Sequence, residues 1–186
     1  MEKNLYFLGL QPPFALAATI TQLKEDISRR YGCTHALNVP PHLTLVPPFR
    51  AGTGMQGLGG KMPAFAASVS PFPVYLRGFG YFENAHNRVI FVAVDATSPL
   101  QDIWRGLSGL VCETLTGMPR RKEEDFHPHI TLAHRDLTSD AFYEAWPHYQ
   151  NTVFEATFTA QEITLFVHQD RHWEVASRYP FGEGDP

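Results

Sequence analysis

Two segments of the chain share one five-residue pattern, proline–histidine–aliphatic–threonine–leucine. They are Pro41–Leu45 (PHLTL) and Pro128–Leu132 (PHITL). Composition alone predicts roughly 0.001 copies of this pattern in such a chain, so two copies indicate a shared role. Side chains at positions i and i+2 of a strand point to the same face. We therefore expect His42 to project with Thr44, and His129 with Thr131, while the aliphatic residues face the core.

These residue types suit chemistry at phosphorus. An unperturbed histidine has a pKa of about 6.5, so at neutral pH one imidazole can accept a proton while another donates one. Threonine hydroxyls can donate hydrogen bonds to phosphate oxygens. An in-line displacement needs a base on one side and an acid on the other, and each proton transfer contributes about 10²–10⁴-fold in rate. We predict His42 and His129 as catalytic residues and Thr44 and Thr131 as phosphate-binding residues, with no metal or cofactor required.

Other histidines leave alternatives open. His42 and His129 could be structural, and a metal site could use His127, His129 and His134 near Asp125, although Pro128 interrupts this group and no standard zinc spacing appears. We expect no metal. The remaining histidines are interpreted as surface-loop residues, including the pair that flanks a predicted turn: His35, His86, His148, His168 and His172.

Residues 52–57 match the dinucleotide-binding pattern G-x-G-x-x-G. They lack a parallel strand–helix–strand context and an acidic residue about 20 positions later, both of which that function requires. We interpret residues 51–60 as a mobile loop that precedes a short helix.

Composition limits the classes of function. The 186 residues fit one domain over 1–186, and the net charge of −4 disfavours a protein that coats DNA or anionic membranes. No apolar run approaches the roughly 18 residues of a spanning helix, and the stretch at 5–10 is too short for a signal peptide. With Cys33 and Cys112 as the two cysteines, a disulfide framework is not expected. These features predict a cytoplasmic monomer.

Hydrophobic periodicity predicts a strand, helix and strand in each half of the chain. Apolar residues three to four apart indicate a helix over 14–31 that stops at Gly32. Ser98 is expected to cap a second long helix, with Pro99 at its first position and its end at Gly117. A third helix is expected over 139–149. Strands are expected at 5–10, within 34–49, at 73–80 and 88–95 joined around 83–87, within 125–137, and at 154–158, 162–168 and 173–179. This order predicts an α+β fold of two pseudo-equivalent lobes around a cleft.

The duplicated motifs, the opening strand with its proline pair and the helices between them resemble the two-histidine (2H) phosphoesterases over nearly the whole chain. This family includes RNA 2′,3′-cyclic phosphodiesterases, historically called 2′-5′ RNA ligases. The resemblance implies a bilobal, pseudo-symmetric fold with two antiparallel-rich sheets around a central cleft and helices outside. It also implies hydrolysis of a 2′,3′-cyclic phosphate to a 2′-phosphate, with His42 as proton donor, His129 as proton acceptor, and Thr44 and Thr131 holding the phosphate.

One position departs from the family pattern. Many members place an arginine five residues after the second motif's histidine, where this chain has His134 followed by Arg135. A shift of one residue along a strand turns a side chain to the other face. Arg135 is therefore not expected to contact the phosphate in the family's manner.

We predict a cyclic phosphodiesterase that acts on an RNA 3′ end or a small cyclic nucleotide, with 2′-5′ ligation as its reverse reaction. A locally positive cleft could draw on Lys61, Arg50 or Arg135, and Phe49 and Tyr81 are candidates for stacking on a base. The alternative is a protein of the same fold that binds nucleotides or RNA ends without turnover. A metal-dependent hydrolase that uses His127–His134 is a weaker third hypothesis.

Overall fold

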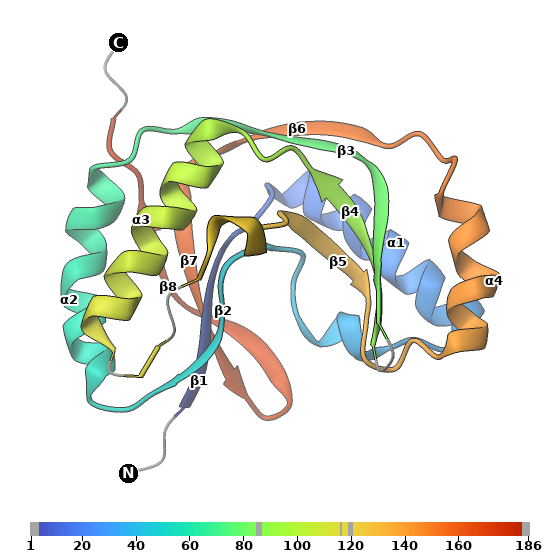
Figure 1. The fold of residues 1–186 in the computed structure, drawn as a ribbon, viewed down its shortest axis with the longest axis horizontal. Helices are drawn as coiled ribbons and strands as arrows, with labels where there is room; N and C mark the ends of the chain where they lie inside the picture. The colour runs from blue at the N-terminus through green and yellow to red at the C-terminus, as the bar shows by residue number, and fades with distance from the viewer. Residues whose placement is uncertain (1–3, 85–86, 116, 119–120, 184–186) are drawn as a thin grey trace.

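The computed structural model describes residues 4–84, 87–115, 117–118 and 121–183. Figure 1 shows helices at the two ends of a strongly curved sheet. The strands are β1 (Asn4–Leu10), β2 (Leu43–Ala51), β3 (Phe72–Glu83), β4 (Arg88–Val94), β5 (His129–Ala133), β6 (Glu155–Ala160), β7 (Glu162–Gln169) and β8 (His172–Pro180). The α-helices are α1 (Phe14–Tyr31), α2 (Gly54–Ala67), α3 (Ser98–Thr114) and α4 (Ser139–Tyr149), with short 3₁₀ helices η1 (His35–Asn38) and η2 (Glu123–Asp125).

All eight strands form one sheet in the order β6-β3-β4-β5-β2-β1-β7-β8. Every neighbouring pair is antiparallel. The α+β fold with antiparallel strands and outer helices confirms the prediction, with one correction. The two expected sheets are halves of a single sheet, joined where β2 meets β5 through the pair Leu43 and Ile130.

The two halves repeat each other outward from this central seam. One half runs β2-β1-β7-β8 and the other runs β5-β4-β3-β6. Helix α1 joins β1 to β2 but packs on β5, whereas α3 joins β4 to β5 but packs on β2. Each half is therefore covered by a helix that belongs to the other half's strand–helix–strand unit (Figure 1). This exchange ties the lobes together and fixes the two motif strands beside each other.

The helices form where apolar residues repeat along one face. In α1 the buried Ile20 and Ile27 lie two turns apart, and Gly32 ends the helix in the left-handed conformation that suits glycine. The N-cap position of α3 is Thr97 rather than Ser98, without a capping hydrogen bond to its side chain, which places Pro99 at the second helical position and corrects the predicted cap by one residue. The helix ends at Thr114, before the predicted Gly117.

The glycine-rich segment is a helix from Gly54 onward, not the predicted loop over 51–60. Leu58, Met62 and Ala66 lie four residues apart and are fully buried, and α2 packs on α3 and β8. This packing outweighs the low helix propensity of the glycines.

One further prediction needs adjustment. In the segment 34–49, residues 35–38 form η1 and the strand begins only at Leu43. The turn expected around 83–87 connects β3 to β4, but residues 85 and 86 lie outside the described residues. No helix among the described residues is long and apolar enough to cross a membrane.

Candidate active site

The two motif segments meet at the seam of the sheet. Leu43 pairs with Ile130 in antiparallel register, which sets His42 opposite Thr131 and Thr44 opposite His129. Leu43, Leu45, Ile130 and Leu132 are buried, whereas the histidines and threonines are only half-buried. The structure therefore confirms the predicted alternation of faces. Each histidine is brought beside the other motif's threonine.

Both catalytic candidates are held by the same backbone contact. His42 Nδ1 lies 2.8 Å from the carbonyl oxygen of Pro40, and His129 Nδ1 lies 2.6 Å from the carbonyl oxygen of His127. A carbonyl oxygen can only accept a hydrogen bond, so Nδ1 is the protonated nitrogen in each ring. The Nε2 atom of each neutral imidazole is therefore left as the proton acceptor, or as a donor once the ring is charged.

Each imidazole also lies against two phenylalanine rings from equivalent strands. His42 contacts Phe7 of β1 at 4.5 Å and Phe166 of β7 at 5.5 Å between ring centroids. His129 contacts two rings in the same way, Phe91 of β4 at 4.9 Å and Phe82 of β3 at 5.1 Å. These apolar walls fix the rings and reduce their contact with water.

Glycine is required beside one of these walls. A Cβ atom on Gly80 would lie 2.5 Å from the Phe91 ring, which crosses β3 at this point. Any larger residue would push Phe91 away from its position under His129.

A cavity of about 390 Å³ opens on the concave side of the seam. His42, Thr44 and Thr131 line it, whereas His129 is not among its lining residues and lies opposite Thr44 in the strand register. The remaining walls come from the β1 residues Leu5 and Phe7, from Pro48 of β2, from η1 and the segment after it, from the turn at 134–135, and from the β7–β8 hairpin. The volume exceeds what one phosphate group requires.

Burial makes both imidazoles weak bases. The His42 ring reaches the cavity, but most of it is enclosed by protein, and this burial lowers its pKa to about 3 despite the Pro40 contact. Nearby Lys24 lowers this pKa further by charge repulsion. The His129 pKa is also lowered, by burial first and by repulsion from His127 second. Both rings are neutral at pH 7 in the absence of a bound anion.

Lys24 of α1 is a buried charge next to the cavity. Its side chain is 2% exposed, and Nζ donates to the carbonyl oxygens of Ala36 at 3.2 Å and Val39 at 3.0 Å. Burial lowers its pKa to about 8. No carboxylate pairs with it among the described residues. The ammonium thus holds the cavity-lining segment in place and adds positive potential beneath it.

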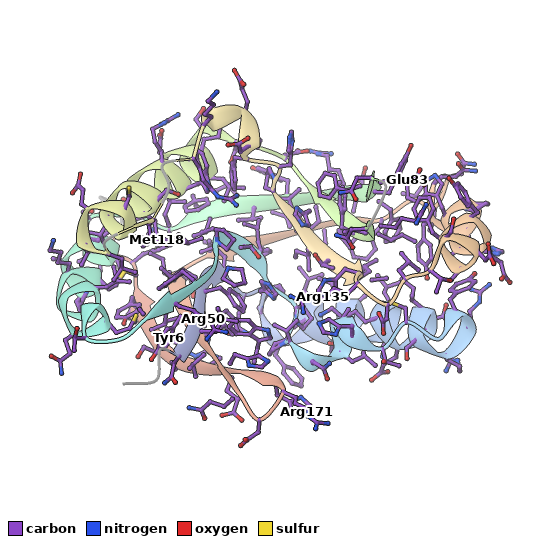
Figure 2. All side chains as sticks on the ribbon, turned by 60° about the horizontal axis from the view of Figure 1, so that its bottom comes forward. Tyr6, Arg50, Glu83, Met118, Arg135 and Arg171 are labelled. Atoms are coloured by element: carbon purple, nitrogen blue, oxygen red, sulfur yellow. The ribbon has the colours of Figure 1, made fainter. Side chains whose placement is uncertain are left out.

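Arg135 reaches the cavity by a backbone change that the sequence did not predict. Its φ of 61° lies in the left-handed region, which is unusual for a residue other than glycine. This conformation ends the strand alternation after Ala133, and both His134 and Arg135 line the cavity. Figure 2 shows Arg135 near the centre of the molecule. The expectation that its side chain turns away is therefore corrected.

Asp136 fixes the turn that carries these two residues. Its carboxylate accepts from the backbone N–H groups of Thr34 at 2.8 Å and His35 at 2.9 Å. It also accepts from the Cys33 thiol at 2.7 Å, and burial together with this carboxylate raises the thiol pKa to about 12. Cys33 is consequently a structural thiol. The resulting link between two loops places His35 at the cavity with its ring 4.9 Å from that of His134.

Four other predicted contributors lie away from the cavity. Phe49 is 3% exposed and packs in the core beside Tyr6, so it is not available to stack on a base. Tyr81 is 46% exposed but lies against Phe142 and Trp146 of α4. Lys61 of α2 donates to Thr114, and Arg50 is not among the residues that line the cavity. These outcomes correct both predicted stacking residues and two of the three predicted cations.

The β7–β8 hairpin supplies cavity residues that the sequence interpretation missed. His168, Arg171 and Trp173 all line the cavity, and so does His35, although His168 and His35 were expected to be surface-loop histidines. The one sequence feature that could have pointed to these residues is the mixture of aromatic and charged side chains around a two-residue turn. Nothing in the sequence indicates that this hairpin lies beside the first motif, because that contact depends on the pairing of β1 with β7.

The histidines of the metal hypothesis do not converge. His129 Nδ1 is engaged by the His127 carbonyl group, while His134 faces His35. Among the residues that the structure describes, no three His, Cys, Asp or Glu side chains are grouped to hold a metal ion.

The sequence profile of the 2′-5′ RNA ligase superfamily matches residues 12–172. A protein named "Putative phosphoesterase" from Geobacillus thermodenitrificans (strain NG80-2) is 29% identical over 167 residues, which cover 88% of this chain and 90% of the relative. A second relative with the same name, from Bacillus pumilus (strain SAFR-032), is 31% identical over 118 residues, 62% of this chain and 64% of the relative.

Solved structures share the fold. TT0787 of Thermus thermophilus superposes with a TM-score of 0.73 at 23% identity, covering 97% of this chain and all of that one. LigT of E. coli in apo form superposes with a TM-score of 0.69 at 16% identity, covering 98% of this chain and all of that one. LigT of E. coli complexed with 3′-AMP superposes with a TM-score of 0.66 at 18% identity, covering 97% of this chain and 99% of that one.

Proposed function

The chain belongs to the 2′-5′ RNA ligase superfamily, and on this premise we propose that it is a metal-independent cyclic phosphodiesterase. It hydrolyses the 2′,3′-cyclic phosphate of an RNA 3′ end or a small nucleotide to a 2′-phosphate. The observation that carries this proposal is the pair of equivalent Nδ1 contacts to backbone carbonyl groups, which leave two Nε2 atoms for proton transfer beside two threonine hydroxyls.

The proposed reaction is an in-line displacement. His129 accepts a proton from water, whose oxygen forms a bond to phosphorus while the bond from phosphorus to O3′ breaks. His42 donates a proton to O3′, which leaves the phosphate on O2′. Thr44, Thr131 and Arg135 hold the non-bridging oxygens, and exchange of protons with solvent restores the starting states. A 2′-5′ ligation would follow the same path, with an RNA 5′-hydroxyl group held in place of water as the nucleophile.

The lowered pKa values suit the proposed role of His129 as a base but oppose the proposed role of His42 as an acid. The neutral His129 is ready to act as a base. The acid role of His42 requires a bound phosphate, because an adjacent negative charge favours the imidazolium and raises its pKa. The solved complexes of LigT with 3′-AMP and with phosphate support a nucleotide or phosphate ligand for this fold.

The test uses phosphorus NMR to follow adenosine 2′,3′-cyclic phosphate and a cyclic-phosphate-ended oligoribonucleotide in the presence of EDTA. We expect a 2′-phosphate product from the wild type and from His148→Ala, which replaces an exposed histidine on α4. His42→Ala and His129→Ala should give no product above background. Tight nucleotide binding without turnover by the wild type would contradict the proposal and favour the non-catalytic binding protein. Loss of activity with EDTA would favour metal-dependent hydrolysis.

A further inference from the structure

The cavity extends beyond the motif residues toward the β7–β8 hairpin. His168, Arg171 and Trp173 form its wall there, together with Leu5 of β1. Strand pairing explains the grouping, because His168 pairs with Trp173, and Tyr6 pairs with Val167. None of the three hairpin residues has a role in the proposed proton transfers. We call this part of the cavity, formed by His168, Arg171 and Trp173, the hairpin subsite.

Trp173 presents a fixed aromatic surface in this subsite. Its ring meets Phe7 edge to face at 4.7 Å and His168 at 5.1 Å. Phe7 in turn contacts His42 at 4.5 Å and stacks on Phe166 at 4.3 Å. The indole is therefore two ring contacts from the catalytic candidate and is half-buried in a cavity wall. Such a surface can stack on a nucleobase of any identity.

Arg171 supplies a positive charge at the tip of the same hairpin (Figure 2). It is exposed, and none of the ion pairs among the described residues includes it. Asp170 and Arg171 have φ values of 45° and 70°, so this two-residue turn adopts the left-handed conformation without glycine. A strained arginine that lines a cavity is positioned for an anion.

We propose that the hairpin subsite binds the nucleoside next to the reacting phosphate, with the base on Trp173 and the 5′-phosphate on Arg171. This inference rests on the proposed function and narrows its substrate class. The preferred substrate is a ribonucleotide that carries a phosphate on its 5′ side, as every residue at an RNA 3′ end does, rather than a cyclic-phosphate nucleoside alone.

The first experiment measures binding by calorimetry and does not depend on turnover. Adenosine 3′,5′-bisphosphate should bind about tenfold more tightly than adenosine 3′-phosphate, the gain expected from one charge-assisted contact. Arg171→Asn should abolish this difference, because asparagine tolerates the left-handed turn but lacks the charge. Arg171→Lys should retain most of it. Arg178→Gln, which removes an arginine paired with Glu162 on the same hairpin, should leave it unchanged.

The second experiment separates stacking from a structural effect of Trp173. Trp173→Leu should weaken binding of adenosine 3′-phosphate about tenfold but leave the affinity for inorganic phosphate unchanged, and Trp173→Phe should restore most of the loss. A thermal melt verifies that each variant is folded. Equal weakening of nucleotide and phosphate would mean that Trp173 only supports Phe7 and His42, which would overturn the stacking role.

Hydrolysis rates then distinguish the two proposals. The ratio of kcat/KM for the 5′-phosphorylated and unphosphorylated cyclic nucleotides should be about ten in the wild type and near one in Arg171→Asn. Discrimination in binding without any hydrolysis would leave the hairpin subsite standing and contradict the cyclic phosphodiesterase. Hydrolysis by a wild type that binds the two adenosine ligands with equal affinity would support the cyclic phosphodiesterase and contradict the hairpin subsite.

Discussion

The two halves of the site share a design but differ in their surroundings. His42 and His129 have the same backbone contact and equivalent phenylalanine pairs. Phe7 and Phe166 around His42 are buried, whereas Phe82 beside His129 is partly exposed. Lys24 repels a proton on His42, and His127 does the same for His129. The repeat thus sets the geometry of the pair, while the surroundings make the two imidazoles chemically different. For the proposed mechanism, a bound phosphate must therefore raise the pKa of His42 before this ring can donate a proton.

The largest loss of activity should come from replacing the histidine of either half. We expect His42→Ala and His129→Ala each to lower kcat by about 10²–10⁴-fold, because each removes one proton transfer. If the two rings act as one unit, the kcat of the double variant should be only slightly below that of the less active single variant. Single-turnover kinetics would measure these losses. An activity within tenfold of wild type for either single variant would show that the halves are not both catalytic.

Acid should destabilise the protein through its buried histidines, and most strongly through His42. The folded-state pKa of His42 is about 3 and that of His134 about 4, both below the unfolded value near 6.5, so the unfolded chain binds more protons between these limits. The contribution of these neutral histidines to the free energy of unfolding is fully present above pH 6.5 and is lost as the pH falls. The loss is up to about 1.4 kcal/mol per pH unit for His42 and less for the more accessible His134. Urea unfolding from pH 7 to 4.5 would measure this slope.

His42→Asn is the informative variant for that slope, since it removes one titrating group from the buried half. We expect its stability to depend less steeply on pH than that of the wild type. A slope unchanged by His42→Asn would mean that this imidazole is already protonated in the folded protein, which would reverse our comparison of the halves.

The threonines should give smaller and more equal effects. Thr44→Val and Thr131→Val each remove one hydroxyl donor while keeping the side-chain shape, and we expect kcat/KM to fall about 10- to 100-fold in each case. Similar losses in both variants would confirm that the phosphate lies on the pseudo-symmetry axis. A loss confined to one variant would place the phosphate in one half only.

The smallest expected change distinguishes the electrostatics of the halves. Lys24→Met removes the buried charge, so the pKa of His42 should rise while that of His129 stays the same. NMR titration of the two rings would detect this. The variant also leaves the carbonyl groups of Ala36 and Val39 without their donor, which should lower the free energy of unfolding by about 1–3 kcal/mol. An equal rise in both histidine pKa values would show that Lys24 does not discriminate between them.

Local sequence determined most elements of this fold and the identity of the motif residues. The helices over 14–31 and 139–149 have the predicted bounds, because their apolar spacing and end signals agree. The alternation in PHLTL and PHITL fixed which side chains point away from the core, since a strand has a period of two. These features depend on residues that are close together in the chain.

Tertiary structure decided the rest of the site. The glycine-rich segment became a helix only because its apolar residues found a partner in α3 and β8. Arg135 lines the cavity through a left-handed backbone angle that Asp136 stabilises from the following position. Lys24 lies under the cavity because α1 packs against η1, and Trp173 lines the cavity because β7 pairs with β1. The sequence names the proposed reacting groups, but the charges and surfaces around them come from contacts between distant segments, whose free energy depends on the whole fold rather than on any local pattern.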